Sequence, residues 1–198
     1  ITLAFNGEIY NYKDLKEELK DSWKFESSSD TEVILAAYKK WGKKCFERFD
    51  GMWAIAIYDG NKDKFILCRD RLGEKPLYYA QTPKTIFFAS EVKSLVKSKL
   101  IDFKINREFA CNYLFTAQSK FNSEKIPTLF SNIFEVEPGT FYEIKIKNFK
   151  LVKRKYWDIN SIKEKREINE EYCCKKINTW MKNSVLERLN ADVRVAIT

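Results

Sequence analysis

The chain has 198 residues, with 36 lysines and arginines against 28 aspartates and glutamates, and it contains no histidine. The lack of histidine excludes Ser-His-Asp and Cys-His catalytic pairs and HExxH zinc sites within these residues. Hydrophobic residues make up 44% of the sequence and aromatic residues 15%, which indicates a packed core rather than a disordered chain. The formal charge of +8 comes mostly from lysines spread along the chain, so it predicts a solvated basic surface and no nucleic-acid partner.

The five cysteines stand at unrelated spacings and form no CxxC pair. This pattern predicts neither a zinc cluster nor a disulfide framework, and it favours reduced thiols in a cytoplasmic protein. Cys45, Cys68 and Cys111 lie within apolar patterns, so we expect core thiols rather than nucleophiles there. No apolar run approaches the length of a membrane span, and no membrane partner is expected.

The apolar pattern of the first part of the chain predicts strands and helices in close succession. In chain order these are a strand over residues 1–5, helices over 12–20 and 29–41, and strands over 51–59 and 65–68. The first strand is expected to end at the turn dipeptide Asn6-Gly7, and the second helix to start at a Ser or Asp cap and stop at Gly42. The nearly continuous apolar run over 51–59 indicates a strand buried on both faces, as in the middle layers of a four-layer sandwich.

The rest of the chain continues this pattern and then changes character after Trp157. The expected elements are strands over 76–80 and 85–89 that continue the sheet, helices over 91–97 and 107–115, and antiparallel strands over 132–137, 140–146 and 151–157. Residues 160–169 are charged and linker-like, 170–190 predict one long amphipathic helix, and 192–198 predict a new strand. The sequence therefore indicates an α+β domain, a linker, and a helix and strand that open an α/β unit.

Several separated motifs resemble the glutamine-dependent asparagine synthetases, and their order and spacing match that family over essentially the whole chain. The motifs are FNGEIYN at 5–11, SSDTEV at 28–33, GMWAIAIYD at 51–59, RDRLGEKPLYY at 69–79, FASEVKSL at 88–95 and ADVRVAIT at 191–198. The resemblance implies an incomplete four-layer αββα sandwich of the N-terminal-nucleophile hydrolase fold, followed by the first helix and strand of an α/β ATP-pyrophosphatase domain. It implies a class II glutamine amidotransferase domain over 1–158 without its N-terminal part, a linker over 159–168, and the start of a synthetase domain over 169–198.

In the family that the chain resembles, an N-terminal cysteine attacks the glutamine carboxamide and uses its own α-amine as the base. The freed ammonia then attacks a β-aspartyl-adenylate to give asparagine. The resemblance assigns the oxyanion hole to the Asn6 side-chain amide and the Gly7 N–H, and glutamine binding to these two residues with Glu8 and Asp30. Such donors suit the negative charge that builds on the attacked carbonyl oxygen, and carboxylates suit the α-ammonium group of the substrate. Without the resemblance, Asn6-Gly7 would be a turn, Glu8 an exposed charge and Asp30 a helix cap.

The nucleophilic cysteine and the nucleotide-binding loop of that family do not occur within the 198 residues. The resemblance therefore implies an internal piece of a larger enzyme, inactive alone, with glutamine as its partner and no metal or cofactor of its own. Aspartate, ATP and magnesium would belong to the parent enzyme, and a homodimer stays open. Two alternatives also stay open. One is a related amidotransferase that amidates a cell-surface sugar or a peptide, and the other is a non-catalytic amidotransferase-like scaffold.

Two charged groups are expected to be structural rather than catalytic. Arg69, Asp70 and Arg71 stand at a predicted strand end, where salt bridging is the expected role. Glu91 and Lys93 follow Ser90 and predict a capped, charged first turn of a helix.

Overall fold

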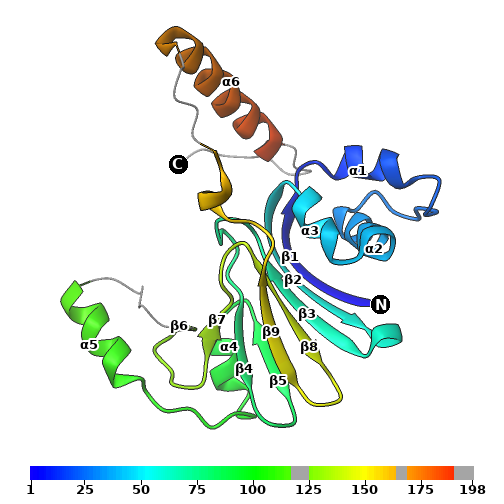
Figure 1. Ribbon diagram of the computed structural model, residues 1–198. Coiled ribbons are helices and arrows are strands. Elements are labelled where there is room, and N and C mark those ends of the chain that lie inside the picture. The colour runs from blue at the N-terminus through cyan, green and yellow to red at the C-terminus, as the bar shows by residue number, and fades with distance from the viewer. Residues whose placement is uncertain (117–124, 164–168, 190–198) are drawn as a thin grey trace.

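The computed structural model describes residues 1–116, 125–163 and 169–189, which form two antiparallel sheets and their covering helices (Figure 1). The first sheet has the strand order β1-β2-β3-β8-β9, and the second has the order β5-β4-β7-β6. The first sheet contains β1 (Thr2–Ile9), β2 (Gly51–Asp59), β3 (Lys64–Arg69), β8 (Thr140–Lys145) and β9 (Lys150–Lys155). The second contains β4 (Tyr78–Gln81), β5 (Ile86–Ala89), β6 (Ile126–Pro127) and β7 (Phe134–Glu135).

The α-helices of the described residues are distributed before, between and after these strands. They are α1 (Tyr12–Leu19), α2 (Asp30–Trp41), α3 (Cys45–Arg48), α4 (Val92–Lys97), α5 (Arg107–Thr116) and α6 (Glu170–Arg188). None of the helices that the structure describes is long and apolar enough to cross a membrane.

Three layers of apolar side chains hold the sheets and helices together. The first lies between the first sheet and helices α1 to α3, and Trp53 and Ile55 contribute to it from β2. The second lies between the two sheets and takes Ala54 and Ala56 from the same strand. The third packs Leu95 of α4 against the far face of the second sheet. Alternate residues of β2 thus point into different layers, as expected for a strand buried on both faces of a sheet, and the layers run in the order helix, sheet, sheet, helix.

Helix α2 confirms the predicted boundaries and shows how the local sequence sets them. Ser29 is its N-cap, and the Ser29 side chain accepts a hydrogen bond from the backbone N–H of Thr31 at 3.1 Å. Gly42 follows the last helical residue with a φ of 58°, in the left-handed region that glycine adopts without strain. The cap is therefore Ser29, and Asp30 is the first helical residue.

Three predictions about strands and thiols are wrong. Strand β1 does not end at Asn6-Gly7 but continues to Ile9, because these residues pair with β2 instead of turning. Strands β4 and β5, predicted to continue the first sheet, form a second sheet, and β7 joins them through its pairing with β4 rather than with β8. Cys111, predicted in the core, is exposed, whereas Cys45 and Cys68 are buried as expected.

The long helix after the sandwich is confirmed as α6, and it projects away from the sheets (Figure 1). Its apolar side chains face outward, with Trp180 63% exposed and Met181 64% exposed. Near its C-terminal end, the guanidinium carbon of Arg188 lies 5.0 Å from the centre of the Tyr10 ring, and its side chain lies 3.8 Å from Glu74. The predicted strand over 192–198 and part of the predicted linker lie outside the described residues.

Candidate active site

The predicted site residues Asn6, Gly7 and Glu8 are consecutive on β1, the edge strand of the first sheet in the described structure. They lie opposite Ala54, Trp53 and Met52 of β2 respectively. Burial alternates along β1, with the odd-numbered side chains turned toward the helices. Asn6 and Glu8 therefore share the other face of the strand, the face toward the second sheet.

The backbone N–H of Gly7 points away from β2 toward the open edge of the sheet. The evidence comes from Trp53, which lies opposite Gly7 on β2. The backbone N–H and carbonyl oxygen of Trp53 both bond to Asp70, on the side away from β1. Its N–H donates to Asp70 Oδ2 at 3.2 Å, and its carbonyl oxygen accepts from the Asp70 N–H at 2.9 Å. In an antiparallel ladder, a pair of this kind exchanges no hydrogen bonds, and the groups of both residues face outward. Gly7 can therefore donate to a ligand at the edge.

Glycine is required at Gly7 because β1 and β2 approach each other too closely there for a side chain. A Cβ on Gly7 would stand 2.1 Å from the carbonyl oxygen of Met52, and its φ of 151° lies outside the range that other residues adopt readily. Gly51 repeats the pattern from the other strand, where a Cβ would stand 2.1 Å from the carbonyl oxygen of Glu8. The two glycines thus fix the distance between the strands on either side of Glu8.

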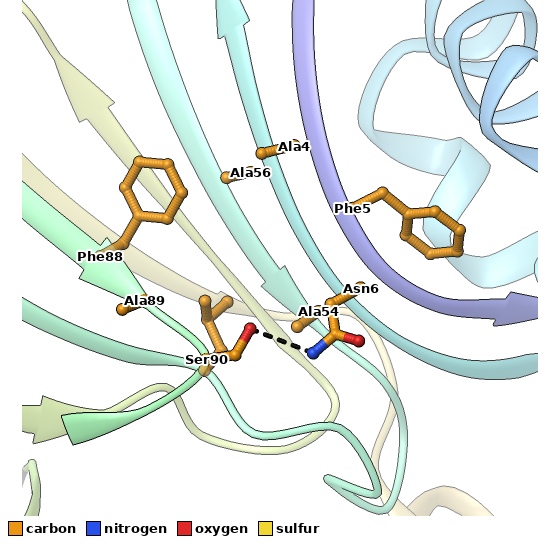
Figure 2. A pocket seen from close by; sticks show the side chains of 9 residues that line it. Ala4, Phe5, Asn6, Ala54, Ala56, Phe88, Ala89 and Ser90 are labelled. Atoms are coloured by element: carbon orange, nitrogen blue, oxygen red, sulfur yellow. Dashed lines mark hydrogen bonds between the residues drawn. The ribbon is translucent and has the colours of Figure 1, made fainter. Parts of the chain in front are cut away.

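The Asn6 side chain lines a pocket of about 120 Å³ between the edges of the two sheets (Figure 2). Its Nδ2 donates a hydrogen bond to the hydroxyl oxygen of Ser90 at 3.0 Å. Apart from Asn6 and Ser90, the residues that line the pocket are alanine, leucine and phenylalanine. The polar neighbour of the exposed Asn6 carboxamide among the lining residues is therefore Ser90.

Asp30 meets β1 from the helix side of the sheet edge. Its Oδ2 accepts a hydrogen bond from the backbone N–H of Ile9 at 3.1 Å. The N–H groups of Gly7 and Ile9 emerge on the same side of β1 because these residues are two positions apart. Asp30 and the Gly7 donor therefore belong to one edge. Glu8, next to Gly7 on β1, is exposed.

The segment that leads into Asp30 is organised by Glu32. The Glu32 carboxylate accepts hydrogen bonds from the Trp23 indole at 3.0 Å, from the Glu26 N–H at 3.0 Å, and from both the N–H and the hydroxyl of Ser27. The hydroxyl of Ser27 and the backbone N–H of Glu26 hold the pKa of Glu32 at about 2. One charged side chain thus shapes the connection between α1 and α2.

Of the three charged residues predicted to form salt bridges, Arg69 forms one, whereas Asp70 accepts hydrogen bonds from backbone N–H groups and Arg71 donates to backbone carbonyl oxygens. Arg69 pairs with Glu135 of the second sheet and donates to the carbonyl oxygens of Gly73, Lys75 and Val136. Asp70 is buried and accepts backbone hydrogen bonds from the loop that follows it, in addition to the one from Trp53. They fasten β2 and β3 in place behind the site.

The buried thiols are poorly suited to attack a substrate. Burial raises the pKa of both the Cys45 and the Cys68 thiols, which disfavours the reactive thiolate. The pocket beside Asn6 has no cysteine among its lining residues. Among the described residues, no three His, Cys, Asp or Glu side chains gather closely enough to hold a metal ion.

Two residues that bear on the site were not identified from the sequence. Ser90 was expected at the start of a helix, yet the N-cap of α4 is Glu91, without a side-chain capping bond, and Ser90 contacts Asn6 instead. The charged pair that follows it is present, because Glu91 and Lys93 form an exposed ion pair. The sequence predicts Gly51 as the start of a strand but does not indicate its close approach to Glu8. The position of these residues in known sequence motifs was the one available signal.

Comparisons with known proteins point to one family. A family model described as a glutamine amidotransferase domain matches residues 1–157. The chain is similar to a glutamine-hydrolysing asparagine synthetase of Bacillus subtilis, with 35% identity over 163 residues, covering 82% of this chain and 22% of the relative. It is also similar to the amidase chry2 of Gibberella zeae, with 31% identity over 204 residues, covering 100% of this chain and 28% of the relative.

A solved structure shares the fold. It is the glutamine phosphoribosylpyrophosphate amidotransferase of B. subtilis, which superposes with a TM-score of 0.51 at 21% identity and covers 78% of this chain and 29% of that one. This chain therefore spans well under half of the length of these relatives.

Proposed function

Since the chain belongs to the glutamine amidotransferase domain family, we propose that it supplies the substrate-binding and oxyanion-stabilising part of a site that hydrolyses glutamine to glutamate and ammonia. Asn6 and Gly7 are the oxyanion donors, and Glu8 and Asp30 bind the substrate. The observation that carries this proposal is the pairing of β1 with β2, which leaves the Gly7 N–H free at the sheet edge beside the Asn6 amide.

The chemistry follows from the charge that develops on the substrate. When a thiol adds to the carboxamide carbon of glutamine, the carbonyl oxygen becomes an oxyanion, and two fixed N–H donors stabilise it more than they stabilise the ground state. Collapse of this intermediate expels ammonia and leaves a thioester, which water hydrolyses to glutamate. The attacking cysteine and its α-amine base are proposed to lie outside these 198 residues, so that the chain alone is inactive.

Ammonia transfer is the second part of the proposal. The asparagine synthetases among the relatives are considerably longer than this chain, and we place residues 1–158 in the amidotransferase domain, 159–168 in a linker, and 169–198 at the start of a synthetase domain. There the ammonia would attack a β-aspartyl-adenylate made from aspartate and ATP with magnesium. The outward apolar side chains of α6 support this division, because a helix with Trp180 and Met181 exposed has the composition of one that packs against a further layer.

The test uses the full-length protein and two separate assays. Glutamate release from glutamine reports the proposed site, and asparagine formation from added ammonia, aspartate and ATP bypasses it. We expect Asn6→Ala to lower the first by about 10²–10³-fold, the usual cost of losing one oxyanion donor, and to leave the second unchanged. Asn61→Ala, in the exposed 3-10 helix Gly60–Lys62, is the matched control. Equal loss of both activities would count against the oxyanion assignment.

A second candidate is an amidotransferase that serves another acceptor, and what supports it is that one relative that matches over the whole chain, the amidase chry2, has a name other than asparagine synthetase. The same site would then release ammonia for another carbonyl compound, such as a sugar or a peptide. Glutamine hydrolysis without asparagine formation from aspartate and ATP would favour this acceptor class. A full-length protein that hydrolyses no glutamine would instead favour a non-catalytic scaffold.

A further inference from the structure

Ser90 links the two sheets at the candidate site. It follows the last residue of β5, the edge strand of the second sheet, while Asn6 lies on β1, the edge strand of the first. Their side chains meet across the pocket, with Asn6 Nδ2 directed at Ser90 Oγ and Asn6 Oδ1 turned away from it (Figure 2). A hydrogen bond at 3.0 Å thus joins residues that are 84 positions apart.

The described residues around this hydrogen bond offer no other side chain that could orient the Asn6 amide. The other lining residues of the pocket have apolar side chains, including Ala54 and Phe88, and they cannot orient an amide. The Ser90 hydroxyl does not cap α4 either, since the cap position belongs to Glu91. Ser90 is half-buried and Asn6 is exposed, so water competes for this hydrogen bond, and Ser90 is the polar side chain of the pocket that holds the amide against that competition. Its described side-chain role is therefore the contact with Asn6.

The orientation of Asn6 decides what the residue can do. A carboxamide can rotate about its Cβ–Cγ bond, and one orientation offers N–H donors where the other offers an acceptor oxygen. The acceptor would repel an oxyanion. The amide nitrogen carries two hydrogens. When Ser90 Oγ accepts a hydrogen bond from one of them, the second can donate to the substrate oxygen. Donors that are oriented in advance stabilise a transition state without reorganisation.

We infer that Ser90 is a positioning residue, which holds the Asn6 carboxamide with its N–H toward the substrate oxygen. The inference rests on the proposed glutamine-hydrolysing function. It adds the residue that follows the edge strand of the second sheet to a site whose other members come from β1 and α2. Ser90 acts through Asn6 and does not itself contact the glutamine.

The kinetic test compares Ser90→Ala, Ser90→Thr and the matched control Ser94→Ala in the full-length protein. Ser94 lies four residues further on, in α4. We expect Ser90→Ala to lower kcat for glutamine hydrolysis by about tenfold, less than the loss of the donor itself, with KM and ammonia-dependent synthesis unchanged. Ser90→Thr keeps the hydroxyl and should restore kcat to within about twofold. Ser94→Ala should match the wild type.

The double variant Asn6→Ala with Ser90→Ala separates positioning from a general structural effect. If Ser90 acts only through Asn6, the double variant is no slower than Asn6→Ala alone, because the two residues form one unit. A wild-type kcat in Ser90→Ala, losses that multiply in the double variant, or a parallel fall of ammonia-dependent synthesis would overturn the inference.

Crystal structures of the full-length wild type and Ser90→Ala provide a readout that does not depend on activity. We expect one ordered Asn6 side chain in the wild type and a rotated or divided one in the variant. An unchanged Asn6 in Ser90→Ala would refute the positioning role even if the protein hydrolysed no glutamine. A wild type without glutaminase activity but with the expected change at Asn6 would refute the proposed function and leave the positioning of Asn6 established.

Discussion

The Asp30 carboxylate and the backbone N–H of Ile9 are joined by a hydrogen bond of 3.1 Å, which fastens the first residue of α2 to the strand that carries the candidate site. This bond uses Oδ2 and leaves Oδ1 available to a ligand. Asp30 can therefore serve the fold and the substrate together, and the two roles can be separated by substitution.

Asp30→Asn should separate them, because asparagine keeps an acceptor for the Ile9 N–H but loses the negative charge. We expect KM for glutamine to rise about 10- to 100-fold, as for the loss of a hydrogen bond to a charged group, with little change in thermal stability. Asp30→Ala removes both roles and should also lower the free energy of unfolding by about 1–2 kcal/mol. Asp21→Asn, exposed in the segment before α2, is the control. An unchanged KM in Asp30→Asn would remove Asp30 from the binding site.

Gly7 and Gly51 should each resist the smallest possible substitution. In Gly7→Ala or Gly51→Ala the new Cβ would meet a backbone oxygen at 2.1 Å, which only a shift of β1 relative to β2 can relieve. We expect a loss of at least about 2 kcal/mol in the free energy of unfolding and a fall in glutaminase activity. Gly60→Ala is the matched control, because its Cβ would find no atom closer than 3.6 Å. Chemical denaturation of the three variants measures the difference, and wild-type stability of Gly51→Ala would disprove the close approach.

Glu32 should make the stability of the α1–α2 connection depend on acid. Its pKa in the folded protein is about 2, below the ordinary value of 4.5, because the ionised form accepts several hydrogen bonds. The depressed pKa contributes stability that is complete above about pH 4.5 and is lost as the pH falls toward 2. Glu32→Gln should therefore be less stable than the wild type at pH 7, and the difference should shrink between pH 4.5 and 2.

Thermal unfolding followed at several pH values measures this dependence. Glu26→Gln, which removes an exposed carboxylate from the same connection, controls for the loss of one charge. A wild-type to Glu32→Gln difference that stays constant down to pH 2 would contradict the assigned role of the ionised carboxylate.

Local signals in the sequence predicted the elements well. The Ser29 cap and the Gly42 stop bound α2 as expected, and the unbroken apolar run of β2 correctly indicated burial on both faces. In these cases the residues that determine the structure lie within the element itself. The predicted turn at Asn6-Gly7 is wrong for the opposite reason. The pair is of a type common in turns, but it is held in a strand by pairing with β2, which lies more than forty residues later in the chain.

Partners across the sheets were outside the reach of sequence patterns. Nothing in the residues of β4 and β5 distinguishes a continued sheet from a second one, because both require the same alternation. The contact of Ser90 with Asn6 and the opposition of Gly51 and Glu8 arise only when distant strands are placed side by side. The motif resemblance predicts Asn6, Gly7, Glu8 and Asp30 as site residues, but it could not indicate which residues support them.

The alternation of side chains along β1 makes the length of this strand as important as its composition. Asn6 faces the pocket and Phe5 faces the helices because they are neighbours on a strand of fixed register. A single inserted or deleted residue before Asn6, with the pairing retained, would turn the amide toward the helices and an aromatic ring or glycine toward the pocket. Strand β1 can thus change many of its residues and still serve the site, but it cannot change its length by one.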